Sequence, residues 1–450
     1  MAVRRAAVVA GVLLTVSAPA ALAAGGPGRT HGASGPARTT AAVETPAVHD
    51  DEQGGNADAD DPAVWVDPDD PGLSLVVGTL KEAGLDVYGT DGRRLQHLDA
   101  PGAPGEGSEP GRLNNVDIVY GFELDGHATD LALVSDRGRD RVRAYAIDPA
   151  AVSAGRPPLT DVTARGVRPV FSGDEEEVDE QRNAYGLAAY SDDDAAYAVV
   201  SRREETGLKL LRLKDVGGRV GYTTRDSAAL PASFTLPGGK RWTPCADPGE
   251  RPQVEGMAVD QEEHILYAAQ EDVGLWRIGL DGGEFAAPSL FDKVREYGVP
   301  WSYDEEKEEC VLDTAHDPGH GGRRLSADAE GLTVYHAGDG RGYVLASSQG
   351  DDTFAVYGRG ERTPYVGSFT VTDGPATDSV QHSDGSTVVN SPLGRAFPKG
   401  VLVTHDGAET PADGERPGTN FKFTRWDRLA AAFPDPLTVD PDSFDPRDPG

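Results

Sequence analysis

Residues 342–357 read GYVLASSQGDDTFAVY, which is two short apolar runs on either side of a polar turn. Short runs rich in Val, Leu, Phe and Tyr and bounded by Gly and Asp are typical of β-strands. The stretch therefore predicts two strands joined by a tight connection.

The same pattern recurs along the chain, and the starts of the runs lie about 55 to 80 residues apart. The other runs are residues 75–88, 130–147, 195–213, 264–278 and 402–426. The intervening segments hold further alternating runs such as 365–371, so each unit has room for a four-stranded sheet and a loop. Six such units predict an all-β fold, a single-domain six-bladed β-propeller. A pair of β-sandwiches is the alternative, and the even spacing argues against it.

Helical patterns are scarce, because 56 Gly and 33 Pro interrupt the chain and only residues 426–433 could form a short helix. Met1–Arg5 carries two arginines, an apolar run follows, and Ala21-Leu22-Ala23 is a small-residue cleavage pattern. We therefore expect a secreted, extracellular protein. The expected segments are a signal peptide (1–23), a disordered leader (24–42), the propeller (43–435) and a flexible C-terminal tail (436–450).

The formal charge is 42 − 75 = −33. Nucleic acids and anionic membranes require a basic surface, so neither is expected as a partner. An acidic protein that binds a polyanion needs metal cations to reverse the local field. We expect a monomer acting on a small molecule.

The two cysteines, Cys245 and Cys310, lie in two long connections, residues 236–254 and 292–327. In an exported protein a disulfide between them is the favoured interpretation. A zinc site is the alternative. His316 and His320 lie near Cys310, but nothing similar flanks Cys245.

Carboxylates occur in turns directly beside the predicted strands. A single acidic residue in a turn usually only faces solvent. Here, however, six such strand-adjacent carboxylate sites recur along the repeated units. Oxygen ligands in this number suit calcium, whereas zinc and iron prefer His or Cys. The strand-adjacent acidic positions are Asp58, Asp60, Asp61, Glu204, Glu205, Glu255, Glu271, Asp272, Asp328, Glu330 and Asp384.

Isolated basic residues stand near these acids, at Lys81, Arg137 and Arg202-Arg203. They could be salt-bridge partners of the acids, or a clamp for a phosphoryl group beside a carboxylate-held metal. No P-loop and no Gly-x-Ser-x-Gly elbow is present in the sequence. Metal-assisted hydrolysis, with a calcium-bound water as nucleophile, is the chemistry that remains.

Several of these stretches, in this order and spacing, resemble the β-propeller (alkaline) phytases over residues 45 to about 432. The stretches that carry the resemblance are 58–65 (DADDPAVW), 113–118 (LNNVDI), 184–186 (AYG), 255–258 (EGMA), 330–335 (EGLTVY), 342–350 (GYVLASSQG) and 372–375 (TDGP). The resemblance implies a six-bladed propeller with several calcium ions. Its activity would be a 3-phytase-like phosphomonoesterase that hydrolyses phytate, as its calcium complex, at neutral to alkaline pH.

The resemblance also implies site residues. Those that would act at the phosphate being cleaved are Lys81, Arg137, Tyr185 and Arg203, with Glu204 as a further catalytic residue. Those that would hold the catalytic calcium ions are Asp60, Glu204, Glu255, Glu271, Asp328, Glu330 and Asp384. Those that would hold structural calcium ions are Asp61, Pro62 and Val116 (through the carbonyls of the last two), Gln349, Asp351 and Asp378.

The chain departs from the family pattern at a few positions. Arg203 stands where Lys is usual, and Gln270 replaces an acid beside Glu271. The stretch 379–383 lacks an acidic, Gly-rich turn, and the two long connections could roof the site. A calcium-containing propeller lactonase or esterase and a non-catalytic, calcium-stiffened binding propeller are the alternative functions. The lactonase would need His and Asn ligands near the axis, and it does not explain the bases beside the acids.

Overall fold

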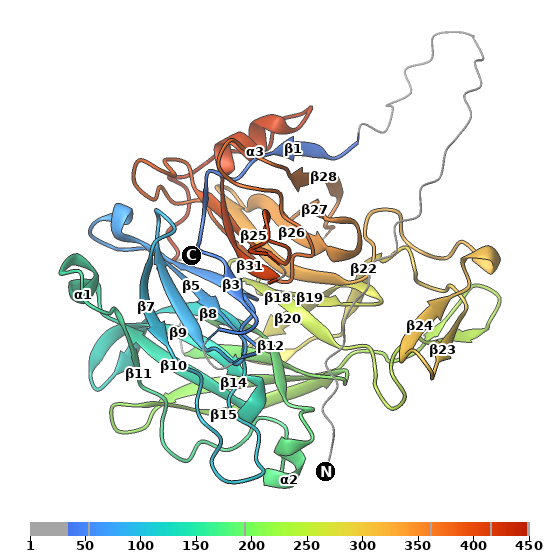
Figure 1. Ribbon diagram of the computed structural model, residues 1–450, viewed down its shortest axis with the longest axis horizontal. Helices are drawn as coiled ribbons and strands as arrows, with labels where there is room; N and C mark the ends of the chain where they lie inside the picture. Colours follow the sequence, from blue (N-terminus) through green and yellow to red (C-terminus); the bar gives the residue numbers. More distant parts are fainter. Residues whose placement is uncertain (1–34, 53–54, 193–194, 361, 415, 448–450) are drawn as a thin grey trace. The chain divides into compact units, whose positions relative to one another are not determined.

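The computed structural model describes residues 35–52, 55–192, 195–360, 362–414 and 416–447. From Pro36 onward the chain forms one compact unit. Its larger sheets are the six blades of a β-propeller, as the repeats predict (Figure 1). Each predicted run forms the second and third strands of a blade, because the polar turn inside it joins two antiparallel neighbours.

The blades follow one another along the sequence. The first three are β4 (Pro62–Trp65), β5 (Leu75–Thr79), β6 (Leu85–Gly89) and β7 (Arg94–Leu98); β8 (Leu113–Leu124), β9 (His127–Asp136), β10 (Arg141–Ile147) and β11 (Leu159–Asp161); and β12 (Ala184–Ser191), β13 (Ala196–Arg202), β14 (Gly207–Asp215) and β15 (Val220–Ala229). In each, the strands lie in chain order from the first strand outward.

The remaining three blades include partners from the N-terminus and from nearby loops. They are β18 (Val254–Asp260), β19 (Ile265–Gln270) and β20 (Gly274–Asp281), with β21 (Glu284–Phe285) and β22 (Ser289–Lys293) both on β20; β25 (Ala329–Ala337), β26 (Arg341–Ser348), β27 (Thr353–Gly358) and β28 (Tyr365–Val371), with β1 (Ala37–Thr39) parallel to β28; and β29 (Ser386–Val389), β30 (Val401–Asp406) and β31 (Gly418–Arg425), with β2 (Val43–Glu44) and β3 (Val48–His49) on β31. The N-terminal strands thus complete the last two blades.

The first strands of neighbouring blades contact one another in a closed circle, β4–β8–β12–β18–β25–β29–β4. Apolar side chains fill the space between adjacent blades. One cluster joins Leu131 and Leu133 of the second blade to Ala198 and Val200 of the third. A ring closed in this way has no exposed inner edge, and it brings the starts of all six inner strands to one channel.

Helices are short and peripheral in the described residues. The three α-helices are α1 (Pro149–Ser153), α2 (Glu175–Asp179) and α3 (Trp426–Ala432), and the four 3-10 turns are η1 (Pro71–Leu73), η2 (Arg137–Arg139), η3 (Thr314–His316) and η4 (Gln349–Asp351). The expected helix near residue 426 is α3. No helix in this part of the chain is long and apolar enough to cross a membrane.

A small hairpin lies at the start of the first long connection and another within the second. These are β16 (Phe234–Thr235) with β17 (Arg241–Trp242) and β23 (Trp301–Asp304) with β24 (Glu309–Leu312). Cys245 and Cys310 form a disulfide, which confirms the predicted pair and removes both thiols from any zinc site. The disulfide ties the two connections to each other.

Two expected segment boundaries are wrong, and the signal peptide lies outside the described residues. The leader was expected to run to residue 42, but Ala37–Thr39 form β1, because their backbone pairs in register with Phe369–Val371. The tail after residue 435 is packed: Leu437 is buried, and Phe444 stacks on His336 at 4.1 Å between ring centroids. The tail is therefore packed against residues far from it in the sequence, and the local sequence does not predict these contacts.

Candidate active site at the channel mouth

Four inner strands share one irregularity near their start. The pairing with the second strand shifts register at Asn114-Asn115, Tyr185-Gly186, Glu255-Gly256 and Glu330-Gly331. A β-bulge locally bends a strand and re-aims its side chains. Asn114, Tyr185, Glu255 and Glu330 therefore occupy equivalent positions on β8, β12, β18 and β25.

Glycines let these strand starts approach closely. A Cβ atom on Gly256 would lie 2.4 Å from the backbone oxygen of Glu330, and one on Gly331 would lie 2.6 Å from that of Asp384. Contacts that short do not occur with backbone atoms, so only glycine fits at both positions. The close approach brings the carboxylate-bearing residue of one blade against that of the next.

The result is a buried carboxylate trio of Glu255, Glu271 and Glu330. One oxygen from each lies within 4.8 Å of the others, and the side chains come from β18, the turn after β19, and β25. Burial raises the pKa of Glu255 to about 7, and it raises the pKa of Glu271 and Glu330 well above the usual value. Neighbouring carboxylates raise these pKa values further, because like charges disfavour ionisation.

Several carboxylate oxygens in and beside the trio have no hydrogen-bond partner. Glu271 Oε1, Glu330 Oε2 and Asp60 Oδ2 are buried and unpartnered in the described structure. A buried carboxylate oxygen without a donor is costly. These three oxygens come from the first, fourth and fifth blades. Carboxylate oxygens are the ligands that a hard cation such as calcium prefers, so the residues present fit the metal that the sequence predicts.

Asp60, Asp328 and Asp384 extend the trio toward the first and sixth blades. Burial is the main cause that raises their pKa values, to about 7 for Asp60 and about 6 for the other two. Lys81 Nζ lies 3.5 Å from Asp60 and 3.7 Å from Asp384, and it donates to Asp58 at 2.6 Å. Burial alone would lower the pKa of Lys81, but these carboxylates raise it, so Lys81 stays charged.

Basic residues form an arc of the mouth on the first three blades, which begins at Lys81 beside the acids of the first and sixth blades. Backbone hydrogen bonds connect them: Leu113 N donates to Lys81 O (3.0 Å), Arg137 N to Arg112 O (2.8 Å), and Arg203 N to Asn183 O (2.9 Å). Asn183 Nδ2 also donates to Arg137 O at 2.9 Å. One hydrogen-bonded path thus spaces Lys81, Arg112, Arg137 and Arg203 around the mouth.

Tyr185 joins the two arcs. Its hydroxyl donates to Glu255 Oε2 at 2.5 Å, and the Arg137 guanidinium lies 5.7 Å from the centre of its ring. Burial and the nearby charges of Arg203 and Arg112 lower the pKa of Arg137 to about 10. Guanidiniums that repel one another beside buried carboxylates are donors of the kind that phosphoryl oxygens accept from.

Glu204 lies at the edge of the site rather than in the trio. It pairs with Arg203 and lies 3.5 Å from Arg182, so its charge is already compensated. Gln253, which the sequence analysis missed, connects this turn to the trio. Its Oε1 accepts from Glu204 N (2.7 Å), and its Nε2 donates to Glu271 (2.9 Å).

Three of the predicted structural ligands lie together. Asp61, Pro62 and Val116 line one cavity of about 140 Å³ in the channel, and Val116 N donates to Asp61 Oδ2 at 2.9 Å.

Two further predicted structural ligands, Gln349 and Asp351, lie in η4. Gln349 donates to Asp384 at 2.5 Å, whereas Asp351 pairs with Arg295 of the long connection at 2.5 Å.

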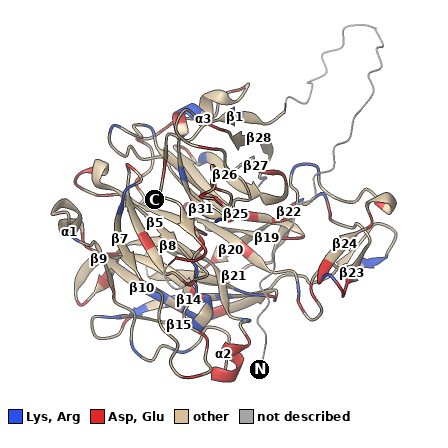
Figure 2. Ribbon diagram, viewed as in Figure 1, with Lys and Arg blue, Asp and Glu red and all other residues tan. Residues whose placement is uncertain are grey.

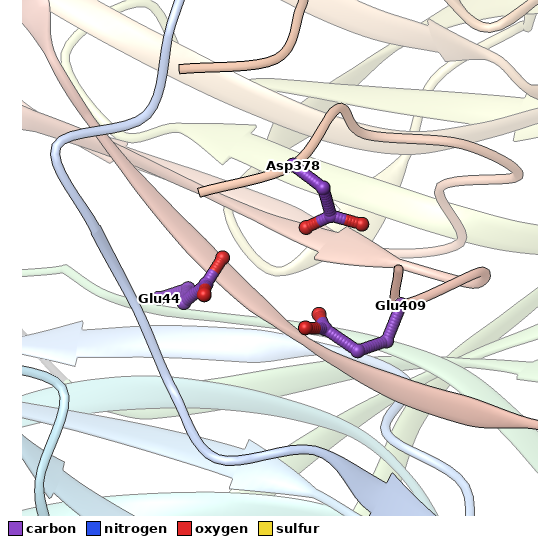
Figure 3. Close-up of side chains that lie close together, drawn as sticks. All are labelled: Glu44, Asp378 and Glu409. Carbon is purple, nitrogen blue, oxygen red and sulfur yellow. The ribbon is translucent and has the colours of Figure 1, made fainter. Parts of the chain in front are cut away.

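Asp378 belongs to a second carboxylate cluster, at the sixth blade. Figure 3 shows Glu44, Asp378 and Glu409 pointing toward one another from separate segments. Lys422 Nζ lies among them, fully buried, paired with Asp378 and at 2.9 Å from Glu44, 2.7 Å from Glu409 and 3.3 Å from Asp406. In this structure Lys422 supplies the positive charge for Asp378.

Sequence reasoning also missed Asn114, His405 and Arg112. Asn114 donates to Glu255 at 2.5 Å, and His405 Nδ1 accepts from Asp384 N at 3.0 Å. The Asn-Asn pair of a recognised motif could have flagged Asn114. Acidic side chains are also spread over the outer loops and along α2, so charge alone does not mark the site (Figure 2).

Comparisons with known proteins match most of the chain. A family model described as Phytase matches residues 5–203 and 294–449 of the chain. A 3-phytase from Bacillus subtilis (strain 168) is 30% identical over 397 residues, which cover 87% of this chain and 85% of that protein.

Among solved structures, a calcium-binding protein, regucalcin, from Agrobacterium tumefaciens strain C58 has a TM-score of 0.42 at 12% identity. It covers 86% of this chain and 96% of its own. A protein from Lactobacillus plantarum has a TM-score of 0.38 at 13% identity, with 72% and 73% covered. At these scores neither likeness bears on function.

Proposed function

Because the chain belongs to the phytase family, we propose that it is a secreted, calcium-dependent phytase whose active site is the channel mouth described above. The observation that carries the proposal is the buried trio of Glu255, Glu271 and Glu330 with its unpartnered oxygens, facing the basic arc. Family membership favours this function over the lactonase and the binding propeller.

Calcium would be held by Asp60, Glu255, Glu271, Asp328, Glu330 and Asp384. Bound there, calcium would supply positive charge for the phosphoryl oxygens of the substrate and for the attacking water. The ions would also explain how a protein with a net charge of −33 accepts a polyphosphate.

The residues of the basic arc would bind and orient the phosphate. Arg137 and Arg203 can donate to its oxygens through planar guanidiniums, which match phosphate geometry. Tyr185 keeps its proton, because burial and then Glu255 raise its pKa well above the ordinary value. Its hydroxyl holds Glu255 in place at 2.5 Å.

Secretion is part of the proposal and has two supports. Met1–Ala23 has the composition of a signal peptide. The disulfide between Cys245 and Cys310 suits an oxidising compartment.

The direct test is phosphate release from phytate by the purified protein, with calcium, after chelation, and after calcium is restored. We expect release only with calcium present, with a lactone and a carboxylic ester left intact. A protein that hydrolyses the lactone but not phytate, or that releases no phosphate under any of these conditions, would disprove the proposal.

A further inference from the structure

Arg112 lies between two residues already assigned to the phosphate. Its carbonyl accepts from Arg137 N at 2.8 Å, and the next residue, Leu113, donates its N–H to Lys81 O at 3.0 Å. The backbone of Arg112 is thus locked into the basic arc at the junction of the first and second blades. Sequence reasoning passed over it, because it stands just before a motif rather than in one.

The side chain of Arg112 is held from one side only. Its terminal nitrogen Nη1 lies 3.3 Å from Glu82 Oε1, and Asn56 Nδ2 donates to the Glu82 carboxylate at 2.8 Å. The Arg112 side chain is 21% exposed, so it is neither a free surface residue nor sealed in the core. Its Nε is buried without a partner in the described structure.

Arg112 and Arg137 are neighbouring cations of the basic arc. The charge of Arg112 is close enough to Arg137 to help lower the pKa of that residue to about 10. Arg137 has no carboxylate within 4.0 Å among the described residues, and its Nε is also buried without a partner. The backbones of Arg112 and Arg137 are hydrogen-bonded to each other, so both guanidiniums belong to the same part of the mouth, and an anion bound there would stabilise both charges.

We propose that Arg112 is a further substrate-binding residue, which contacts the phosphate group together with Arg137 while Glu82 positions it from behind. This inference rests on the proposed function and adds a fourth cation to the set that the sequence analysis assigned. A guanidinium suits the place, because one edge can pair with Glu82 while another faces the phosphate.

The test compares Arg112→Ala and Arg112→Lys with wild type and with Arg156→Ala, a control at an exposed arginine of the α1 turn. The measurements are KM and kcat for phytate, and the inhibition constant and calorimetric affinity of orthophosphate for the calcium-loaded protein. A lost contact between charged groups commonly weakens binding about tenfold or more.

We expect Arg112→Ala to weaken orthophosphate binding and raise KM by about that factor, with Arg112→Lys intermediate and Arg156→Ala unchanged. If Arg112→Ala does not fold, KM and orthophosphate affinity are compared for Arg112→Lys and wild type. This variant keeps the positive charge but loses the planar guanidinium. Wild-type KM and phosphate affinity in a folded variant would overturn the inference.

Failure of the proposed function gives a different result. A wild-type protein that releases no phosphate from phytate would disprove the function. Orthophosphate binding that depends on Arg112 would then still support the anion site, and binding that does not depend on it would overturn that site as well.

Discussion

The hydrogen bond from Tyr185 to Glu255 shows how single residues serve both arcs of the mouth. Glu255→Gln keeps the shape and one acceptor oxygen but removes a charge from the trio. We expect at least about a hundredfold loss of phytate hydrolysis, because each charge that stabilises the transition state is worth on the order of 3 kcal/mol.

The same variant should leave the calcium-free fold intact, because it removes repulsion among buried carboxylates. Its melting temperature without calcium should equal or exceed that of wild type, and the rise on adding calcium should shrink. Glu309→Gln, at an exposed position of β24, is the matched control. Unchanged turnover for Glu255→Gln would mean that Glu255 plays no part in the reaction.

Stability should depend on pH through the buried acids. Burial raises the pKa of Glu255 and Asp60 to about 7 and that of Asp384 to about 6. A carboxylate whose pKa is higher in the folded state stabilises the fold at low pH, and this stability is lost as pH rises through the folded value. The calcium-free protein should therefore melt at a lower temperature at pH 8 than at pH 5.

Calcium should reverse this trend, because its ligands must be deprotonated and it binds only the folded state. The rise in melting temperature on adding calcium should accordingly be larger at pH 8 than at pH 5. Thermal melts in matched buffers, with and without chelator, check both expectations. A calcium-free melting temperature that stays constant or rises from pH 5 to pH 8 would contradict the raised pKa values of these carboxylates.

At the scale of the strand, the repeated bulge and its glycine bring the carboxylates together. In Gly331→Ala the new methyl group would lie 2.6 Å from the backbone oxygen of Asp384, which cannot move aside cheaply. Such overpacking typically costs about 1–3 kcal/mol. We expect a lower melting temperature together with weaker calcium binding.

Gly102→Ala is the control for this substitution, because a Cβ there meets nothing within 4 Å. Chemical denaturation and calcium titration of both variants check the expectation. Equal stability and calcium affinity in Gly331→Ala and wild type would show that the close approach at β25 is unimportant.

The sequence predicts some strands better than others. The second and third strands of each blade are visible because a polar turn separates two apolar runs, as in residues 342–357. The partners of β1, β2 and β3 are more than 300 residues away, and no local pattern encodes such a pairing. The packed tail was missed for the same reason.

For the candidate site, the residue types were recognisable and the contacts were not. Glu255 and Glu330 stand in motifs, so the resemblance finds them. Gln253, His405 and Arg112 act through hydrogen bonds or charges that depend on how neighbouring blades meet. Only the closed ring of inner strands brings these residues into contact.

For the whole molecule, a net charge of −33 and a polyanionic substrate are compatible if the two arcs of the mouth divide the task. The carboxylates of the fourth, fifth, sixth and first blades would hold calcium ions. The basic arc on the first, second and third blades would hold the phosphate. We expect both arcs to be required for the reaction. Activity should therefore follow calcium occupancy of the carboxylate group.

The most direct test is the initial rate of phosphate release from phytate as a function of free calcium, for wild type and Glu330→Gln. The account predicts no release by wild type in chelator and saturation as calcium rises. The curve for Glu330→Gln should be shifted to at least about tenfold higher calcium, because one ligand charge is lost. Undiminished release by wild type in excess chelator would contradict the account.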